Sequence, residues 1–201
     1  LMVNNMIKKI KKILISENVK GVIVYGDTSS TLAGAIAAKQ LNIPIFHVEA
    51  GLRSYNRNMP EELNRLITDH LSTLLFCPNQ NSIKNLYKEK IRNNVFHSGD
   101  VMYDAFLKYS ALIKRKNKKL TPFVLATIHR RENIESKNTL ISIFKSLDEI
   151  NNQIKIIMPL HPHTKIKIES YQIRTKIKFI DPVGYFKMLD LIKSSEIVIT
   201  D

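Results

Sequence analysis

Short apolar runs alternate with longer helix-like segments along the whole chain, and this alternation restricts the fold more than any other feature of the sequence. Residues 21–26 (GVIVYG) and 43–48 (IPIFHV) are continuous apolar runs with several β-branched side chains. Such runs are typical of strands that are buried on both faces. The segment between them, residues 31–42 (TLAGAIAAKQLN), indicates a helix. Strands and helices that take turns, with short loops, predict an α/β fold with a doubly wound parallel sheet.

The same pattern continues to the end of the sequence. We expect further strands at residues 73–78, 94–99, 122–129, 154–161, 176–180 and 197–200. We expect further helices at residues 4–20, 60–72, 79–90, 102–116, 138–150 and 185–196, and a looser segment at 164–171. No solenoid repeat and no low-complexity segment interrupts the series.

A basic polar run at residues 114–120 (KRKNKKL) separates two series of strands and helices. Runs of this kind commonly link domains. We therefore expect a first domain at residues 1–114, a linker at 115–120 and a second domain at 121–201. Open α/β sheets bind ligands outside the carboxyl ends of their strands, so the sequence predicts two α/β domains with a ligand cleft between them.

Composition narrows the functional classes. The 201 residues carry a formal net charge of +13, but the lysines are spread through predicted helices and linkers instead of lying beside exposed aromatic residues. Solvated helix faces explain this charge better than a nucleic-acid surface, and an anionic substrate suits it equally well. No apolar run is long enough to cross a bilayer, and the first residues lack the apolar core of a secretory signal. We therefore expect a cytoplasmic location and no membrane or nucleic-acid partner.

The single cysteine, Cys77, lies in the apolar run LLFCP. One cysteine per chain excludes both a disulfide framework and a Cys-based metal site within the chain. We expect Cys77 to be a small core residue.

Polar residues gather where the predicted strands end, at Asp27, His47, Glu49, His129, His161 and His163. Because ligands bind at the carboxyl ends of parallel strands, this placement favours a functional role. Asp27 taken alone is explained more simply as the N-cap of the following helix, and that alternative stays open.

Helix capping does not account for the charges in residues 47–65 (HVEAGLRSYNRNMPEELNR). A carboxylate follows the buried strand, Arg53 and Arg57 come next, and Glu61 and Glu62 stand at a predicted helix start. These are more charged groups than a helix start requires.

Residues 129–133 (HRREN) place an imidazole beside two guanidinium groups. Such a set is suited to binding phosphates and to moving a proton. The alternative is a charged loop with an Arg–Glu ion pair. Its position at the end of a strand favours the functional interpretation.

A metal site is a weaker interpretation of the histidines. His47 and Glu49 are two residues apart, as are His161 and His163, so each pair could point the same way from a strand. No third ligand accompanies either pair at a recognised spacing, and the nearby arginines would repel a cation. We therefore expect no metal. The apolar setting of Cys77 and the lack of a Gly-x-Ser-x-Gly turn likewise speak against nucleophilic catalysis.

The sequence contains six motifs, in the order GDTSSTLAGAIAA, HVEAGLRS with PEELNR, GDVMYD, HRREN, HPHT and ITD. Together they resemble those of the non-hydrolysing UDP-N-acetylglucosamine 2-epimerases, which are sugar-nucleotide isomerases with the two-domain glycosyltransferase-B fold. The resemblance covers nearly the whole chain. It implies two incomplete Rossmann-like domains: the later part of the N-terminal domain, then the earlier part of the nucleotide-binding C-terminal domain. The chain is accordingly expected to be a fragment that lacks both family termini.

The resemblance also implies a reaction and the residues that carry it out. UDP leaves C1 of the sugar, a proton leaves C2 to give 2-acetamidoglucal, and re-addition after protonation on the other face gives the manno epimer. This chemistry needs carboxylates near C2 and cationic groups around the diphosphate. The residues that match the family's catalytic groups are Asp27, Glu49, Glu61 and His129. Those that match its substrate-binding or supporting groups are Arg53, Arg130 and His161.

By the same resemblance we expect a UDP-sugar substrate and no cofactor, and a homodimer is a possible assembly. Three alternatives stay open. The first is an epimerase for another UDP-sugar, since relatives of this family act on diacetamido uronic acids or deoxy-sugars attached to UDP. The second is a transferase with the glycosyltransferase-B fold, and the third is a noncatalytic fragment that binds a sugar nucleotide.

Overall fold

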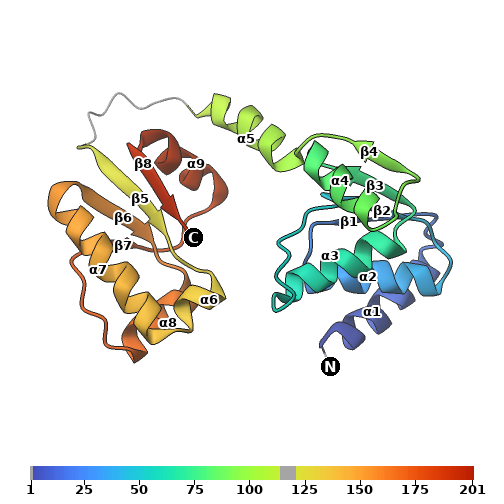
Figure 1. The fold of residues 1–201 in the computed structure, drawn as a ribbon, viewed down its shortest axis with the longest axis horizontal. Helices are drawn as coiled ribbons and strands as arrows, with labels where there is room; N and C mark the ends of the chain where they lie inside the picture. Colours follow the sequence, from blue (N-terminus) through green and yellow to red (C-terminus); the bar gives the residue numbers. More distant parts are fainter. Residues whose placement is uncertain (1, 114–120) are drawn as a thin grey trace. The chain divides into compact units, whose positions relative to one another are not determined.

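The structure, a computed structural model, describes residues 2–113 and 121–201 (Figure 1). The chain forms two compact units, Leu1–Asp104 and Ala105–Asp201, and each of them contains one four-stranded sheet. The expected linker at residues 115–120 lies outside the described residues. In the described ranges, no helix combines the length and the apolar character that crossing a membrane requires.

The first unit is built on a parallel sheet with the strand order β1-β2-β3-β4. Its strands are β1 (Val22–Tyr25), β2 (Ile45–Val48), β3 (Leu74–Cys77) and β4 (Val95–His97). Its helices are α1 (Met2–Ser16), α2 (Ser29–Gln40), α3 (Pro60–Leu71) and α4 (Gln80–Lys88). The expected alternation of strands and helices is confirmed, and each connection returns the chain in parallel to the neighbouring strand.

The helices of the first unit pack on one face of its sheet (Figure 1). Val24 and Ile45 point to that face and are buried against the small side chains of α2. The alanines of α2 allow close approach, and a methyl group added at Gly34 would lie 3.3 Å from Val24. On the opposite face, Ile23 and Tyr25 are exposed. The strand period of two residues therefore assigns each side chain of β1 to one face or the other.

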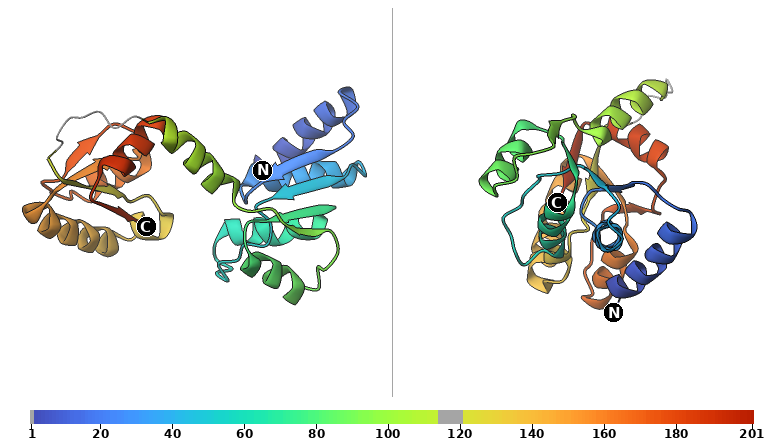
Figure 2. Two further views of the ribbon diagram at one scale, coloured as in Figure 1. Left: turned by 90° about the horizontal axis from the view of Figure 1, so that it is seen from above. Right: turned by 90° about the vertical axis from the view of Figure 1, so that its right-hand side faces the viewer.

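Helix α5 (Val101–Leu112) follows β4 and crosses the boundary between the two units. Asp100 directly precedes the helix, and its side chain accepts hydrogen bonds from the backbone N–H groups of Met102 and Tyr103. Figure 2 shows α5 as one continuous helix. Its later part belongs to the second unit, where the rings of Tyr109 and Tyr185 pack edge to face.

The second unit is also built on a parallel sheet, with the strand order β7-β6-β5-β8. Its strands are β5 (Phe123–Thr127), β6 (Lys155–Pro159), β7 (Lys178–Ile180) and β8 (Ile197–Thr200). Its helices are α6 (Arg131–Ile134), α7 (Lys137–Gln153), α8 (Pro162–Ser170) and α9 (Tyr185–Ser194).

One expectation for the second unit is wrong. Residues 164–171 were expected to be a looser segment, but most of them belong to α8. The helix begins at Pro162, which occupies the first helical turn without losing a hydrogen bond, and His161 caps it by accepting the N–H of His163. Thr164 and Ile168 then provide its buried contacts.

The strand order of the second unit reverses at β5. The chain moves outward from β5 to β6 and β7, and then returns to place β8 on the other side of β5. Helices therefore cover both faces: Val124 contributes to the core cluster that includes residues of α7, and Leu125 to the one that includes residues of α9 (Figure 1). The point of reversal, between the ends of β5 and β8, is where open α/β sheets usually bind ligands.

Candidate active site

Asp27 follows β1 and is not the N-cap of α2. The cap is Thr28, whose Oγ1 accepts a hydrogen bond of 3.3 Å from the backbone N–H of Thr31. The Asp27 carboxylate instead lies 2.6 Å from the Arg65 guanidinium, and its backbone carbonyl accepts a hydrogen bond of 2.8 Å from Asn64. Both partners belong to α3. The capping explanation for Asp27 is therefore excluded, and its carboxylate is held beside a cation at the open end of the sheet.

Glu49 follows β2 with an unusual backbone conformation. Its φ angle is +73°, in the left-handed region that side chains other than glycine rarely adopt. This conformation turns the side chain toward the loop after β1, so that a methyl group added at Gly26 would lie 3.6 Å from the Glu49 carboxylate. Because Gly26 directly precedes Asp27, the structure brings the loops that carry the two predicted carboxylates together. Backbone strain of this kind is concentrated at functional sites.

The surroundings of Glu49 raise the pKa of its carboxyl group above the usual value. Burial is the largest cause, and the negative charges of Asp27 and Asp100 act in the same direction. The positive charges of Arg65 and His47 oppose this shift without cancelling it. A carboxyl group with a raised pKa is better able to accept and return a proton near neutral pH. This shift suits the acid–base role that the sequence predicts for Glu49, and that role stays a prediction.

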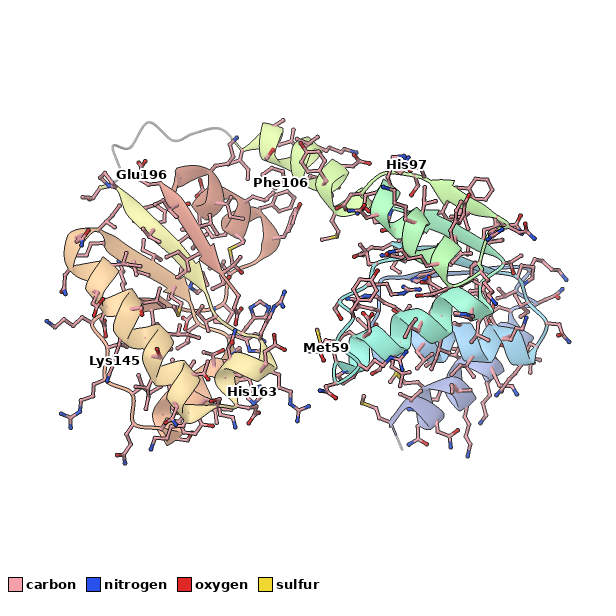
Figure 3. The ribbon with its side chains drawn as sticks, viewed as in Figure 1. Met59, His97, Phe106, Lys145, His163 and Glu196 are labelled. Atoms are coloured by element: carbon pink, nitrogen blue, oxygen red, sulfur yellow. The ribbon has the colours of Figure 1, made fainter. Side chains whose placement is uncertain are left out.

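The two glutamates at the start of α3 differ in their contacts. Met59, labelled in Figure 3, precedes the helix, and Glu61 is exposed in its first turn. Glu62 is buried and accepts hydrogen bonds from the backbone N–H groups of Ser54 and Tyr55 at 2.8 and 3.1 Å. Glu61 is thus accessible, as its predicted role requires, whereas Glu62 holds the preceding loop in place.

Replacing Glu62 with glutamine is expected to lower the free energy of unfolding by about 1–3 kcal/mol at neutral pH, because the amide matches only part of the donor set. Burial raises the pKa of Glu62, but the hydrogen bonds from Ser54, Tyr55 and Arg65 outweigh burial and lower it. The stabilisation is therefore present above the ordinary carboxyl pKa and disappears as the pH falls through the lower folded value. Urea titrations at several pH values measure this. The same loss in Glu61→Gln, or a loss independent of pH, contradicts it.

Arg53 is not at the open edge of the sheet. Its side chain is 1% exposed and lies between two carboxylates, 2.7 Å from Asp69 and 2.7 Å from Glu89. Burial lowers the pKa of Arg53, but the hydrogen bonds and charges of these two partners raise it further than burial lowers it. Of the substrate-binding and supporting roles expected for Arg53, its contacts favour the supporting one.

Cys77 is fully buried at the end of β3, and burial raises the pKa of its thiol to about 12. The thiolate is the reactive form, so the native thiol is expected to resist disulfide reagents at pH 8 and to react once the first unit unfolds. Mass spectrometry of the peptide that contains Cys77, after labelling with and without urea, measures this. Rapid labelling in the native protein contradicts it.

The second unit places His129 and Arg130 after β5, at the reversal of strand order. Asp201, which follows β8, accepts hydrogen bonds from their backbone N–H groups at 3.1 and 2.9 Å and from the Asn133 side chain at 3.0 Å. Burial raises the pKa of Asp201, but these donors outweigh burial and lower it. The same carboxylate lies 3.3 Å from Nδ1 of His129. Asp201 therefore fixes both the loop and the direction of the His129 ring.

The groups in this loop that could hold an anion are accessible. The side chains of His129 and Arg130 are 55% and 54% exposed. The ring of His161, at the end of β6, lies 6.3 Å from that of His129. The alternative explanation, an Arg–Glu pair, is present only as a loose contact of 3.8 Å between Arg130 and Glu132. Two imidazoles and a guanidinium thus converge at one edge of the sheet.

The histidine pairs considered as metal ligands have other partners. Both ring nitrogens of His47 contact Asp69 and the carbonyl of Gly26, so none is free for a cation. Nδ1 of His161 accepts the N–H of His163, and His163, labelled in Figure 3, lies 3.5 Å from Glu135. Within residues 2–113 and 121–201, His, Cys, Asp and Glu side chains form no group of three or more suited to a metal ion.

Sequence reasoning named Asp27, Glu49, Glu61 and Arg53 in the first unit, and His129, Arg130 and His161 in the second. It placed His47 at a strand end without a specific catalytic role, and it assigned no role to Glu62, Arg65, Asp69, Glu89 or Asp201. Glu62 and Arg65 lie in the quoted motif PEELNR and Asp201 in ITD, so the motifs contained a signal. Their partners lie far away in sequence, and a motif does not identify such contacts.

Comparison with known proteins gives consistent matches. The model of a family described as UDP-N-acetylglucosamine 2-epimerase matches residues 1–201. The chain is 45% identical, over 210 residues, to a UDP-N-acetylglucosamine 2-epimerase homolog of Methanococcus maripaludis, covering 98% of this chain and 58% of the relative. It is 42% identical, over 209 residues, to the UDP-2,3-diacetamido-2,3-dideoxy-D-glucuronate 2-epimerase of Pseudomonas aeruginosa, covering 100% of this chain and 58% of the relative.

Among solved structures, the Methanocaldococcus jannaschii UDP-GlcNAc 2-epimerase in complex with UDP-GlcNAc and UDP superposes with a TM-score of 0.91 at 38% identity. The match covers 99% of this chain and 59% of that one. The expected fold, with parallel sheets of the glycosyltransferase-B type, is confirmed, and the chain spans less than two thirds of the length of these relatives.

Proposed function

The chain belongs to the UDP-N-acetylglucosamine 2-epimerase family, and from this premise we propose that the whole protein interconverts UDP-GlcNAc and UDP-ManNAc without releasing the free sugar. The reaction inverts C2 of the sugar while the nucleotide is kept. We also propose that it takes place in the cytoplasm, where nucleotide sugars are made. A homodimer and the absence of nucleic-acid and membrane partners stay predictions.

The chemistry begins with a proton that is difficult to remove. The C2 hydrogen of N-acetylglucosamine is flanked by an acetal carbon and an amide nitrogen, neither of which makes it acidic. Breaking the C1–O bond moves its electron pair to UDP and gives C1 oxocarbenium character. The C2 proton can then pass to a carboxylate, and the C–H electron pair forms the C1=C2 double bond of 2-acetamidoglucal. Protonation of C2 on the opposite face and re-addition of UDP to C1 complete the epimerisation.

We assign the proton transfers to the carboxylates of the first unit. Glu49 has a raised pKa and lies at the loop that carries Asp27, and Arg65 holds the Asp27 carboxylate in place. Two carboxylates with different surroundings, one raised in pKa and one paired with a guanidinium, suit a reaction that removes a proton on one face and returns it on the other. Glu61, which is exposed in the first turn of α3, is the third candidate for a proton-transferring carboxylate.

We assign the departing diphosphate to the second unit. His129, Arg130 and His161 present accessible nitrogen donors at the reversal of strand order, the usual place for a nucleotide in such a sheet. Positive charge at that place stabilises the negative charge that develops on UDP as the C1–O bond breaks. His129 is also suited to donate a proton to the leaving oxygen, because Asp201 orients its ring.

The observation that carries this proposal is the placement of Glu49: a left-handed backbone and a raised pKa beside the loop of Asp27. The test is to incubate the intact protein with UDP-GlcNAc and to separate the nucleotides by anion-exchange chromatography. UDP-ManNAc that approaches a constant ratio to UDP-GlcNAc from either direction is the expected result. Accumulation of free ManNAc with UDP indicates a hydrolysing enzyme and contradicts the proposal.

A second substrate is favoured by one comparison. The Pseudomonas aeruginosa relative that is 42% identical is a 2-epimerase for a diacetamido glucuronate attached to UDP. The same elimination and re-addition apply to that sugar, because its C2 hydrogen has the same neighbours. Comparing kcat/KM for the two UDP-sugars decides between them. If the diacetamido uronate is clearly preferred, it becomes the proposed substrate in place of UDP-GlcNAc, and the proposed mechanism stays the same.

A further inference from the structure

His47 lies beneath the two carboxylate loops, although the sequence placed it at an open strand end. It points from β2 to the face covered by helices and is fully buried. Nδ1 lies 2.7 Å from a carboxylate oxygen of Asp69, which belongs to α3. Nε2 lies 2.8 Å from the backbone carbonyl of Gly26, directly before Asp27. The imidazole therefore spans the distance between α3 and the loop after β1.

Both partners of His47 are hydrogen-bond acceptors, and this determines how many protons the ring carries. A carbonyl oxygen has no proton to give, so Nε2 must be the donor to Gly26. The same reasoning applies to Nδ1 if Asp69 is a carboxylate. A ring turned by 180° would place carbon atoms against both oxygens and lose both bonds. With an ionised Asp69, the arrangement therefore requires protons on both ring nitrogens of His47.

The other contacts of Asp69 are those of a carboxylate. Its second oxygen lies 2.7 Å from the Arg53 guanidinium and accepts a hydrogen bond of 3.1 Å from the backbone N–H of Gly51. Donors of this kind stabilise the ionised form. Arg53 in turn forms two hydrogen bonds of 2.7 Å with Glu89. With both ring nitrogens of His47 protonated, two cations, His47 and Arg53, alternate with two anions in one chain of contacts that is buried except at Glu89, and the charges balance.

This chain of contacts holds both carboxylate loops. Through His47, Asp69 reaches Gly26 and so the loop of Asp27. Through the N–H of Gly51, it holds the loop of Glu49. A methyl group added at Gly51 would lie 2.5 Å from the Ser82 carbonyl oxygen. Only glycine therefore fits at this position, where the backbone of the loop lies close to the backbone at Ser82. One helix side chain thus sets the positions of two loops that come from different strands.

We propose that His47 is a buried imidazolium that acts as a positioning residue for the epimerisation, with Asp69 as its anchor. It fixes the loops of Asp27 and Glu49 relative to each other and supplies a permanent positive charge behind them. The inference rests on the proposed function for its catalytic consequence, but not for the protonation of the ring.

The positive charge of His47 affects the pKa of Glu49. Burial, Asp27 and Asp100 raise the pKa of Glu49, and Arg65 and His47 oppose them. Replacing the imidazolium with a neutral side chain removes one of the two opposing charges, so the pKa of Glu49 rises further. If Glu49 must be ionised to accept the C2 proton, the acid limb of the pH–kcat profile moves to higher pH.

The first test needs no substrate. The intact protein is prepared with ¹⁵N-labelled histidine, and the His47 signals are identified by their loss in His47→Gln. At neutral pH both ring nitrogens are expected to have the nearly equal shifts of an imidazolium, each with a bound proton that exchanges slowly. A single protonated nitrogen beside an unprotonated one overturns the proposal. This outcome is readable even if the protein converts no UDP-sugar, so it separates this inference from the proposed function.

The second test measures positioning. His47→Gln is expected to lower kcat about 10–100-fold with little change in KM, because the catalytic carboxylates lose their fixed positions, and to move the acid limb to higher pH. His70→Gln is the matched control, since His70 is exposed on α3 and, among the described residues, its side chain bonds only the Leu66 carbonyl of its own helix. Should His47→Gln fail to fold, Asp69→Asn, which keeps the size of the anchor, provides the same readouts. A folded variant with an unchanged pH profile and kcat overturns the positioning role.

Discussion

Replacing Glu49 with glutamine is expected to lower kcat for the proposed epimerisation about 10²–10⁴-fold, the usual contribution of a general acid–base group. Glutamine keeps the size of the side chain but cannot accept a proton. The left-handed backbone at φ +73° already belongs to a side chain other than glycine, so the substitution adds no new strain. KM is expected to change little, because the loss concerns the transition state. Steady-state kinetics of the intact protein with UDP-GlcNAc measure both constants.

The control for Glu49→Gln is Glu17→Gln, which removes an exposed carboxylate after α1 and is expected to leave kcat unchanged. Circular dichroism of both variants shows whether the fold is kept. If Glu49→Gln keeps more than half of the activity, Glu49 does not transfer the proton, and the assignment passes to Asp27 or Glu61.

Replacing Arg53 with methionine is expected to lower the free energy of unfolding of the first unit by about 3–5 kcal/mol, because it leaves uncompensated charge in the buried chain of contacts. Asp69 and Glu89 both lose their guanidinium partner, and Asp69 has no exposed surface through which water could replace it. Methionine keeps most of the length of the side chain. The loss is therefore electrostatic and not a cavity effect.

The measurement must follow the unfolding of the first unit alone, because a chain with two units need not unfold in one step. Labelling of Cys77 at increasing urea concentrations does so, since this thiol is buried in the first unit. Arg57→Met is the matched control: the same substitution, in the same loop, at an exposed position. Equal urea midpoints for the two variants contradict a structural role for Arg53.

The order of strands and helices could be predicted because it depends on local patterns. The apolar run at residues 21–26 predicted β1, and the small-residue segment at 31–42 predicted most of α2. Helix α8 was missed because its sequence, PHTKIKIES, alternates apolar and charged residues where a helix would repeat every three to four. Pro162 and the His161 cap indicate where that helix begins, but they do not indicate how far it extends.

The site could be predicted only in part. Motifs located Asp27 and Glu49, since a polar residue after a buried strand is visible in the sequence. They did not indicate that Thr28 caps α2 in place of Asp27, or that Arg65 pairs with it. Arg53 illustrates the same limit: the family resemblance implied a substrate-binding or supporting role, and only the fold shows its guanidinium between the buried carboxylate of Asp69 and the partly exposed carboxylate of Glu89.

Proton NMR of the intact protein with UDP-GlcNAc in deuterated water tests the central claim most directly. The account predicts that deuterium enters C2 in step with the appearance of the UDP-ManNAc anomeric signal, with no lasting free sugar, because every epimerisation removes the C2 proton and returns one from a group that exchanges with solvent. UDP-ManNAc that keeps its original C2 hydrogen, or no turnover of UDP-GlcNAc and of the diacetamido uronate alike, contradicts it.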